Sequence, residues 1–443
     1  RRSKASPKKV DRASDLRSVI NAETIRARLG TSADRQELTL LEAVSEGNVQ
    51  VSQEGRGEAG REEQQPYKLR GDRVQFINSV ETGKRVSIDG RPARIWSGMR
   101  SISGDRITLE RDSGRGLVEG RGTMTVPVKR GLSREVVAGE IPLRVSWTER
   151  LSLAGETLKI VGDVAAEWRQ KWRRQRLSCA QMEVALVGVP GSESNSADWR
   201  DIEIQSLRCR HVVRVHDLSY ADKEVSHVLK SRMADLWYNV KTGEFHTGGP
   251  GWLEFWQKGQ PRPTPLAPTA TARANTPLAL DGSRWQYLRI DFADVATGNT
   301  RDSHATFHEQ VQVLQGPVTG PQESIDADRL GRGDGWLRCD SLQVSQATRT
   351  KGPRTFTLLA NGNSSFSGQA AGQTFFGRAD TVSYDKARDR YVLRSFGQRK
   401  ATLWRKDRRG GPFVRAEAQR VEFSNRNRQL VLDRTTEVSK DGN

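Results

Sequence analysis

The chain is poor in the residues from which catalytic and metal centres are usually built, with three cysteines, six histidines and four methionines among 443 residues. It also lacks the motifs of serine hydrolases, zinc proteases and phosphate-binding loops. The closest pair of histidines, His304 and His308, lies in a predicted strand, where four residues span about 13 Å, too far for one metal ion. We therefore predict a protein that is not an enzyme and that binds no metal or cofactor.

Long apolar runs and helix signals are scarce as well. No run of about 18 apolar residues occurs, so the sequence predicts no membrane-spanning helix. One segment, Asp217 to Leu236, is a candidate helix. The sequence begins at Arg1 with a polar, basic stretch, and we expect it to be an internal piece of a longer product.

What the chain does contain is a short phrase that recurs along its length. The phrase is an apolar residue, a spacer, a small residue, two polar spacers, and two apolar residues separated by one position. Clear copies run from Leu69 to Phe76, Ile102 to Leu109, Leu153 to Ile160, Leu177 to Val184, Leu229 to Leu236 and Leu337 to Val344, with looser ones at Ile20 to Ala27, Leu207 to Arg214, Gly377 to Tyr384 and Ala416 to Phe423. This alternation is typical of a strand with one solvent-exposed face.

Turn-rich stretches follow most copies of the phrase. Asn78 to Gly83 follows the first copy, and Asp112 to Gly114 follows the second. Each leads into another alternating run, and Gly, Asn and Asp supply the tight turns that join antiparallel strands. The sequence therefore predicts an all-β fold of repeated antiparallel hairpins.

All three cysteines occupy the small third position of the phrase, at Cys179, Cys209 and Cys339. Other copies have glycine, serine or alanine there, and a free cysteine behaves as a small hydrophobic residue. We interpret each cysteine as a small buried residue, because the spacing matches no zinc motif. A disulfide between neighbouring strands, such as Cys179 to Cys209, stays open as an alternative.

The charge balance is strongly basic, because 72 Lys and Arg against 54 Asp and Glu give a net charge of +18. Such an excess favours anionic partners, namely nucleic acid, acidic glycans or phosphorylated lipid headgroups. The basic residues occupy spacer positions of nearly every strand, and an ordinary solvated strand face explains the same pattern. Trp168 to Arg174 interleaves aromatic and cationic residues, which we interpret as core filling, with stacking on bases or headgroups as the alternative.

Composition also divides the chain into blocks. Five prolines fall between Pro261 and Pro277, a stretch that cannot join a sheet. We predict a basic tail at 1–15, β modules at 16–128, 129–260 and 284–437, a linker or long loop at 261–283, and a polar tail at 438–443.

The repeated phrases resemble the OstA-like (LptA-like) family, the periplasmic part of the bacterial lipopolysaccharide-transport machinery. The resemblance is carried by "LRGDRVQF", "KRVSIDGRPARIW", "ISGDRITLERDSGRGLVEGRGTMTV", "AETIRARL", "AVSEGNVQV" and "GRADTVSYDKARDRYVLRSFGQRKATLWR". It covers most of residues 16–434 as short units. It implies an elongated, half-open, twisted β jelly roll of two or three stacked modules, with acyl chains inside and the sugar and phosphate headgroup outside. The implied location is the periplasm or envelope of a Gram-negative-type bacterium.

The function implied by this resemblance is non-enzymatic binding and passage of lipopolysaccharide, or a similar amphipathic anionic lipid, to the outer membrane. Other OstA-like modules or envelope transport proteins are the implied partners, joined by edge-strand pairing. By strand alternation the inward residues are the sixth and eighth of each phrase, namely Val74, Phe76, Ile107, Leu109, Leu158, Ile160, Met182, Val184, Leu342, Val344, Val382, Tyr384, Val421 and Phe423. The alternatives are a closed, dry core in a purely structural β-repeat protein, and a nucleic-acid-binding β protein.

Overall fold

The computed structural model describes residues 16–31, 38–55, 67–79, 83–110, 112–130, 136–187, 203–258, 284–331, 333–347, 355–370, 373–385, 388, 390–406, 413–424 and 429–440. These residues form 26 strands in antiparallel arrangement and no helix. Within the described residues no helix is therefore present that could cross a membrane. The prediction of an all-β fold built from antiparallel hairpins is confirmed.

The candidate helix at Asp217 to Leu236 is wrong, because this segment is a hairpin between β13 (Glu203–Ala221) and β14 (Glu224–Asn239). Asp222 and Lys223 form its turn with positive φ angles of 51° and 71°. Such a two-residue turn matches the twist of the two flanking strands. The apolar residues on either side resemble a helical stripe only because two strands are read as one continuous segment.

The chain forms two compact units. Unit 1 comprises Arg1–Val128, Pro142–Ile160 and Gly188–Asp201, and unit 2 comprises Lys129–Ile141, Val161–Val187 and Ile202–Asn443. The strands β8 (Gly122–Arg130), β9 (Val136–Trp147) and β11 (Thr157–Gln170) have residues in both units. The predicted basic tail, the Pro-rich segment 261–283 and the last three residues lie outside the described residues.

In unit 1 the strands pair largely in chain order. They are β1 (Leu16–Asn21), β2 (Thr24–Thr31), β3 (Leu38–Gly55), β4 (Lys68–Ser79), β5 (Gly83–Ser97), β6 (Arg100–Glu110), β7 (Arg115–Glu119) and β10 (Arg150–Ala154). β1 and β2 both pair with β3, and β3 to β6 follow one another. β6 then pairs with both β7 and β8, and β7 pairs with β10.

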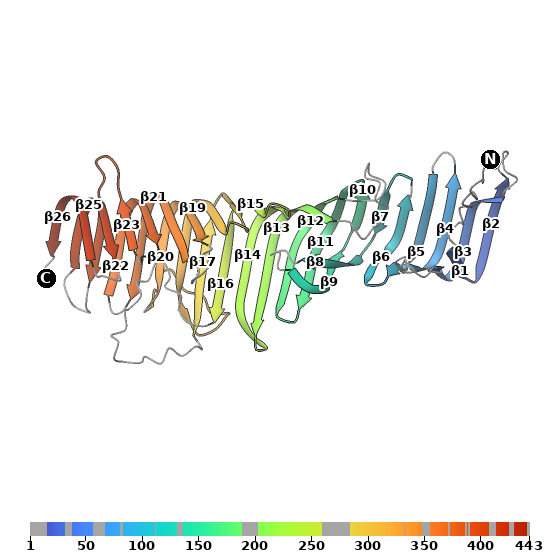
Figure 1. The fold of residues 1–443 in the computed structure, drawn as a ribbon, viewed down its shortest axis with the longest axis horizontal. Helices are drawn as coiled ribbons and strands as arrows, with labels where there is room; N and C mark the ends of the chain where they lie inside the picture. The colour runs from blue at the N-terminus through green and yellow to red at the C-terminus, as the bar shows by residue number, and fades with distance from the viewer. Residues whose placement is uncertain are drawn as a thin grey trace, which may run out of the picture. The chain divides into compact units, whose positions relative to one another are not determined.

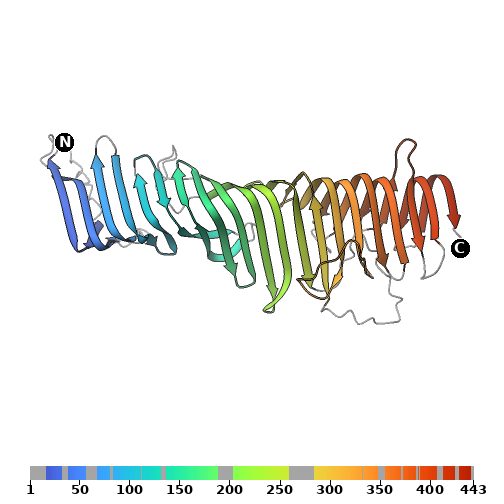
Figure 2. The same cartoon turned by 180° about the vertical axis from the view of Figure 1, so that it is seen from behind.

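In unit 2 the same plan continues through β12 to β26, and Figure 1 shows β19 to β26 side by side. Besides β13 and β14 the strands are β12 (Arg173–Val187), β15 (Glu244–Gly248), β16 (Gly251–Lys258), β17 (Trp285–Phe292), β18 (Val295–Asn299), β19 (His304–Val318), β20 (Gly335–Ala347), β21 (Thr355–Ala370), β22 (Gln373–Asp385), β23 (Arg390–Arg394), β24 (Ala401–Lys406), β25 (Phe413–Ser424) and β26 (Gln429–Lys440). The view from behind in Figure 2 shows the long green strands β12 to β14 lying side by side.

Many long strands bend near the middle and have a separate neighbour for each half. β22 pairs with β24 up to Arg378 and with β23 from Thr381 onward. Where a long strand has one long neighbour on each side, the pairing register shifts near its middle. Against β21 the shift lies between Arg338 and Ser341 of β20, and against β19 it lies opposite Cys339 and Ser341. Bulges bend a strand and increase its twist. The two halves of such a strand therefore belong to two faces of a folded sheet.

In several copies the small third residue of the phrase lies at this bend, whereas in the copy from Leu153 to Ile160 it is Gly155, which lies in the turn between β10 and β11. A Cβ atom added to Gly71 would lie 2.6 Å from the carbonyl oxygen of Asp89, and one added to Gly104 would lie 2.3 Å from Cγ1 of Val118. Cys339 of β20 lies within the bulge described above. The bend leaves room only for a small side chain, which explains why glycine, alanine, serine and cysteine alternate at this position.

An aspartate after the small residue stabilises the bend in unit 2. The Asp380 carboxylate accepts the backbone N–H of Phe396 at 2.8 Å, in the turn that crosses from β23 to β24. Asp340 accepts a hydrogen bond from the Asn363 side chain at 3.0 Å in the neighbouring strand. Asn363 has a positive φ angle of 43°, so this contact lies beside a backbone conformation that asparagine tolerates.

Candidate functional site: the apolar interior

The sixth positions of the phrase align across the strands of unit 1. Val74 lies opposite Ile88, Ile88 opposite Ile107, and Ile107 opposite Val118. Leu151 of β10 continues this row opposite Val118. All five side chains are buried, so the row forms the innermost part of the apolar face.

The eighth positions form a second row, which is more open. Phe76 lies opposite Val86, Val86 opposite Leu109, and Leu109 opposite Gly116. Phe76 and Val86 are half-buried, whereas Leu109 is 41% exposed. Large apolar side chains on the inward face of unit 1 are thus accessible from solvent along this row, which we call the unit 1 rim.

Unit 2 repeats the two rows with deeper burial. In the first row Leu342, Ala360, Val382, Leu393 and Val421 lie opposite one another from β20 to β25. Each of these side chains is no more than 3% exposed. The sixth-position residues of three separate phrases are therefore brought into one continuous apolar row.

The second row of unit 2 is rich in aromatic residues. Val344 pairs with Leu358, Leu358 with Tyr384, Tyr384 with Tyr391, and Tyr391 with Phe423. Val344 is half-buried and the other four are buried. The Tyr384 and Tyr391 ring centroids are 4.5 Å apart, within the range of favourable aromatic pairs.

The two halves of the bent strands meet across this interior. Phe366, from one half of β21, stacks against Tyr391 of the other face with 6.4 Å between ring centroids. Phe375 of β22 meets Phe423 of β25 at 5.7 Å. Both contacts belong to one apolar cluster that extends from Ile290 to Phe423. The interior of unit 2 is therefore continuous through the nine strands β17 to β25.

The remaining predicted residues come from the middle of the chain. Ile160 is fully buried and Leu158 is half-buried in β11. Met182 lies opposite Cys209, and its side chain is buried. Val184, also buried, lies opposite Leu207 in the same pair of strands.

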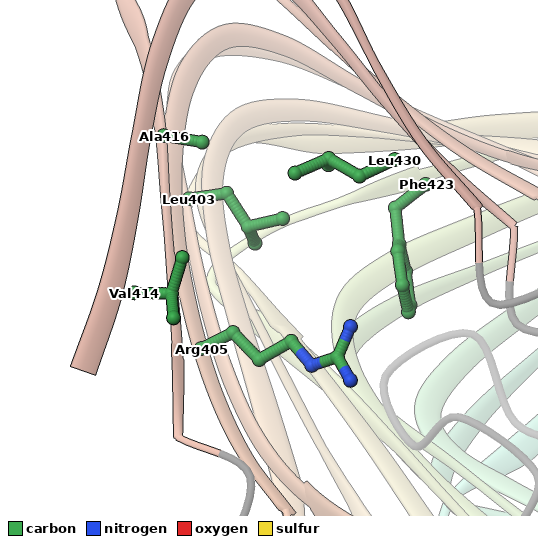
Figure 3. Close-up of a pocket in the computed structure, with 6 residues that line it drawn as sticks. All are labelled: Leu403, Arg405, Val414, Ala416, Phe423 and Leu430. Atoms are coloured by element: carbon green, nitrogen blue, oxygen red, sulfur yellow. The ribbon is translucent and has the colours of Figure 1, made fainter. Parts of the chain in front are cut away.

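An apolar cavity of about 80 Å³ lies toward the C-terminal end of unit 2. Figure 3 shows Leu403, Val414 and Ala416 along one side, with Leu430 and Phe423 across from them. Arg405 extends into the space between, and its guanidinium carbon lies 5.7 Å from the centroid of the Phe423 ring. The cavity thus combines apolar walls with one cation.

Sequence reasoning found Phe423 but not the other residues of this cavity. Leu403 and Arg405 belong to the run that follows Gly397, which the sequence marks as a strand without showing which face is inward. Pairing supplies that information, because Leu403 lies opposite both Gly377 and Ala416. Leu430, which is 38% exposed, lies opposite Phe423.

The three cysteines are buried free thiols, as the interpretation of small buried residues requires. Burial raises the pKa of the Cys339 thiol to about 12, which keeps it neutral near pH 7. Cys179 and Cys209 share a hydrogen bond, and contact with Cys179 together with burial raises the pKa of Cys209. Among the described residues, no group of three or more His, Cys, Asp and Glu side chains is placed to hold a metal ion.

The Trp168 to Arg174 segment divides between core and surface. Trp168 is buried, as core filling requires, whereas Trp172 in the turn before β12 is 43% exposed. Arg173 donates from Nε to Oδ1 of the buried Asp217 at 3.0 Å. Gln175 also donates to Asp217, so this inward carboxylate has two partners.

Comparison with known proteins adds no family assignment. Neither the protein-family models nor the curated proteins contain a match to the chain. The resemblance to the OstA-like family therefore stays a prediction based on the repeated phrases.

Proposed function

We propose that the protein is a non-enzymatic envelope protein that binds the acyl chains of lipopolysaccharide, or of a similar amphipathic anionic lipid, in its apolar interior. In this role it passes the lipid toward the outer membrane from the periplasm. The observation that supports the proposal best is the unit 1 rim, where Leu109 faces inward and is exposed, and Phe76 and Val86 face inward and are only half-buried.

The energetics favour an acyl chain as the ligand of such a surface. Burial of each methylene is worth ~0.8 kcal/mol, so even a partly buried acyl chain gains several kcal/mol. The same contact also covers the exposed part of Leu109 and the half-exposed Phe76. No polar group of the ligand's chain needs a partner, which suits a face built from apolar side chains.

The cation at the cavity of unit 2 supports the anionic character of the ligand. Arg405 lies among five apolar residues in that cavity. A guanidinium there can bind a phosphate or carboxylate while the apolar walls contact the chain. The net charge of +18 favours anions over the rest of the surface as well.

A purely structural role is the second candidate, and unit 2 favours it. The row from Leu342 to Val421 is buried by protein alone, without any ligand. In that case the interior of unit 2 is an ordinary core and the unit 1 rim is a contact surface for another protein.

Binding of a fluorescent fatty-acyl probe to matched variants separates these functions. Leu109 and Thr108 are neighbours on β6 and point to opposite faces. We expect Leu109→Gln to weaken probe binding at least fivefold and Thr108→Gln to leave it unchanged. Equal binding by both variants and the unaltered protein, or no probe binding at all, would reject the acyl-chain proposal.

A further inference from the structure

Two cross-strand pairs on the outer face of unit 2 join cationic or basic side chains. Arg214 of β13 lies directly opposite Arg232 of β14, and His216 lies directly opposite Lys230. Arg214, Arg232 and His216 are exposed, and Lys230 is half-buried. Like charges directly opposite one another destabilise a sheet. The Arg214–Arg232 pair therefore weakens the fold unless an anion lies over it.

The adjacent strand extends the same surface. Arg176 of β12 lies opposite His216, and Arg174 is two residues away on the same face. The Glu167 carboxylate lies 3.4 Å from Arg176 and compensates its charge. Within the residues that the structure describes, no carboxylate lies within ion-pair distance of Arg174, Arg214 or Arg232. We call Arg174, Arg214, Lys230 and Arg232 the cationic patch.

Two members of the patch, Lys230 and Arg174, act on the pKa of His216, which lies directly opposite Lys230. The pKa of this histidine is lowered mainly by the loss of solvent around the ring, and next by the positive charges of Lys230 and Arg174. Asp217 acts in the opposite sense and is outweighed. Its carboxylate is engaged by Arg173 and Gln175. Glu254, directly opposite Lys230, accepts hydrogen bonds from Tyr287 and Arg289, so both neighbouring carboxylates have partners outside the patch.

Cations elsewhere on the same outer face are matched by carboxylates. Arg289 of β17 lies 3.1 Å from Glu254 and 2.7 Å from Asp291. Glu254 lies between Lys230 and Arg289 in the strand order. The contrast shows that the fold places acidic partners beside Arg289 and omits them beside Arg214 and Arg232.

We propose that the cationic patch binds the phosphate groups of anionic lipids at a membrane surface. Adjacent strands are about 4.8 Å apart and alternate residues about 6.6 Å apart, so several flexible cationic side chains converge on an area that a few lipid phosphates cover. Trp172, 43% exposed, lies in the turn two residues before Arg174. An amphipathic indole ring of this kind is favoured at the headgroup level of a bilayer.

A lipid surface fits these observations better than nucleic acid does. Single-stranded nucleic acid needs an extended basic groove with several aromatic platforms in succession. The cationic patch is compact, and of the tryptophans beside it Trp172 is exposed, Trp252 opposite Arg232 is half-buried, and Trp256, whose ring centroid lies 4.8 Å from the Lys230 ammonium, is buried. Because the patch lies on the outer face, its binding does not depend on acyl chains entering the interior.

The test is sedimentation of the full chain with lipid vesicles in low-salt buffer. One set of vesicles is pure phosphatidylcholine, and the other contains one part in five of phosphatidylglycerol. Arg214→Gln with Arg232→Gln removes the opposed pair, and Arg289→Gln is the matched control because its charge is already compensated. Binding of the fatty-acyl probe is measured on the same variants, so that loss of the interior site is detected separately.

We expect the protein to bind the anionic vesicles, to ignore the neutral ones, and to bind more weakly as salt rises. The double variant should lose about 25-fold in vesicle affinity, from roughly fivefold for each of its two cations, whereas the control should keep its affinity. Unchanged binding by the double variant would overturn the proposal. An equal loss in Arg289→Gln would also overturn it, as would tighter binding to a single-stranded oligonucleotide than to anionic vesicles at the same salt.

Discussion

Two glycines on paired strands of unit 1 give opposite predictions for the same substitution. A Cβ atom on Gly104 of β6 would lie 2.3 Å from Cγ1 of Val118 and 2.9 Å from the carbonyl oxygen of Glu119. On Gly116 of β7 its nearest neighbour would be Cδ2 of Leu109, at 3.4 Å. A methyl group at Gly104 would therefore be too close to its neighbours, whereas a methyl group at Gly116 would make an ordinary van der Waals contact.

Overpacking lowers the free energy of unfolding by about 1–3 kcal/mol. Replacing glycine by alanine raises it by about 0.4–1 kcal/mol, because the unfolded chain has fewer conformations. We therefore expect Gly104→Ala to lower the free energy of unfolding by about 1–2 kcal/mol. Gly116→Ala should leave that free energy unchanged or raise it slightly. Denaturant unfolding of the two variants checks this, provided that the slope with denaturant is the same. If Gly104→Ala is as stable as Gly116→Ala, the small residue is not needed at the bend.

Three further predictions concern unit 2. Leu342→Ala should lower the free energy of unfolding by about 2–5 kcal/mol because its site is fully buried, whereas Leu430→Ala, at a site 38% exposed, should cost less than about 1 kcal/mol in the same denaturant titration. Asp217→Asn should cost about 3–5 kcal/mol, since it leaves the Arg173 charge largely buried without its carboxylate; a loss below about 1 kcal/mol would contradict this. The pKa of the Cys339 thiol is raised to about 12 in the folded protein, against ~8.5 in the unfolded chain. The contribution of the neutral thiol to the free energy of unfolding is therefore complete below pH ~8.5 and declines toward pH 12. Mass spectrometry should find no alkylation of this thiol in the folded protein at pH ~8.

The strand pattern and the inward positions could be predicted because both follow from local alternation. Alternation along each strand assigns Val74 and Ile107, and likewise Val382 and Val421, to the inward face, and the pairing agrees. Predicting a sheet with one apolar face requires only this local pattern. The small third position was also visible in the sequence. Its physical cause was not, because the clash between Gly104 and Val118 involves strands whose register is set by pairing.

Features that depend on how two or more strands pair could not be predicted from the sequence. The Arg214–Arg232 pair joins positions eighteen residues apart, and only the register of β13 on β14 places them opposite each other. The hairpin turn at Asp222 was missed for a local reason, since Asp222 favours turns but Lys223, the second turn residue, does not. Leu109 was assigned to the inward face, but its exposure depends on what the opposite half of the folded sheet covers.

The central claim is that the inward face of the strands receives acyl chains, and site-specific photocrosslinking tests it most directly. A photoreactive side chain is placed at Phe76, Leu109 or Val344 on the inward face, and at Arg73 or Arg106 on the outer face as controls. After irradiation in the presence of lipopolysaccharide, we predict lipid adducts at the three inward positions and none at the two arginine positions. Adducts at Arg73 and Arg106 as frequent as those at Phe76 and Leu109, or no adduct at any inward position, would contradict the account.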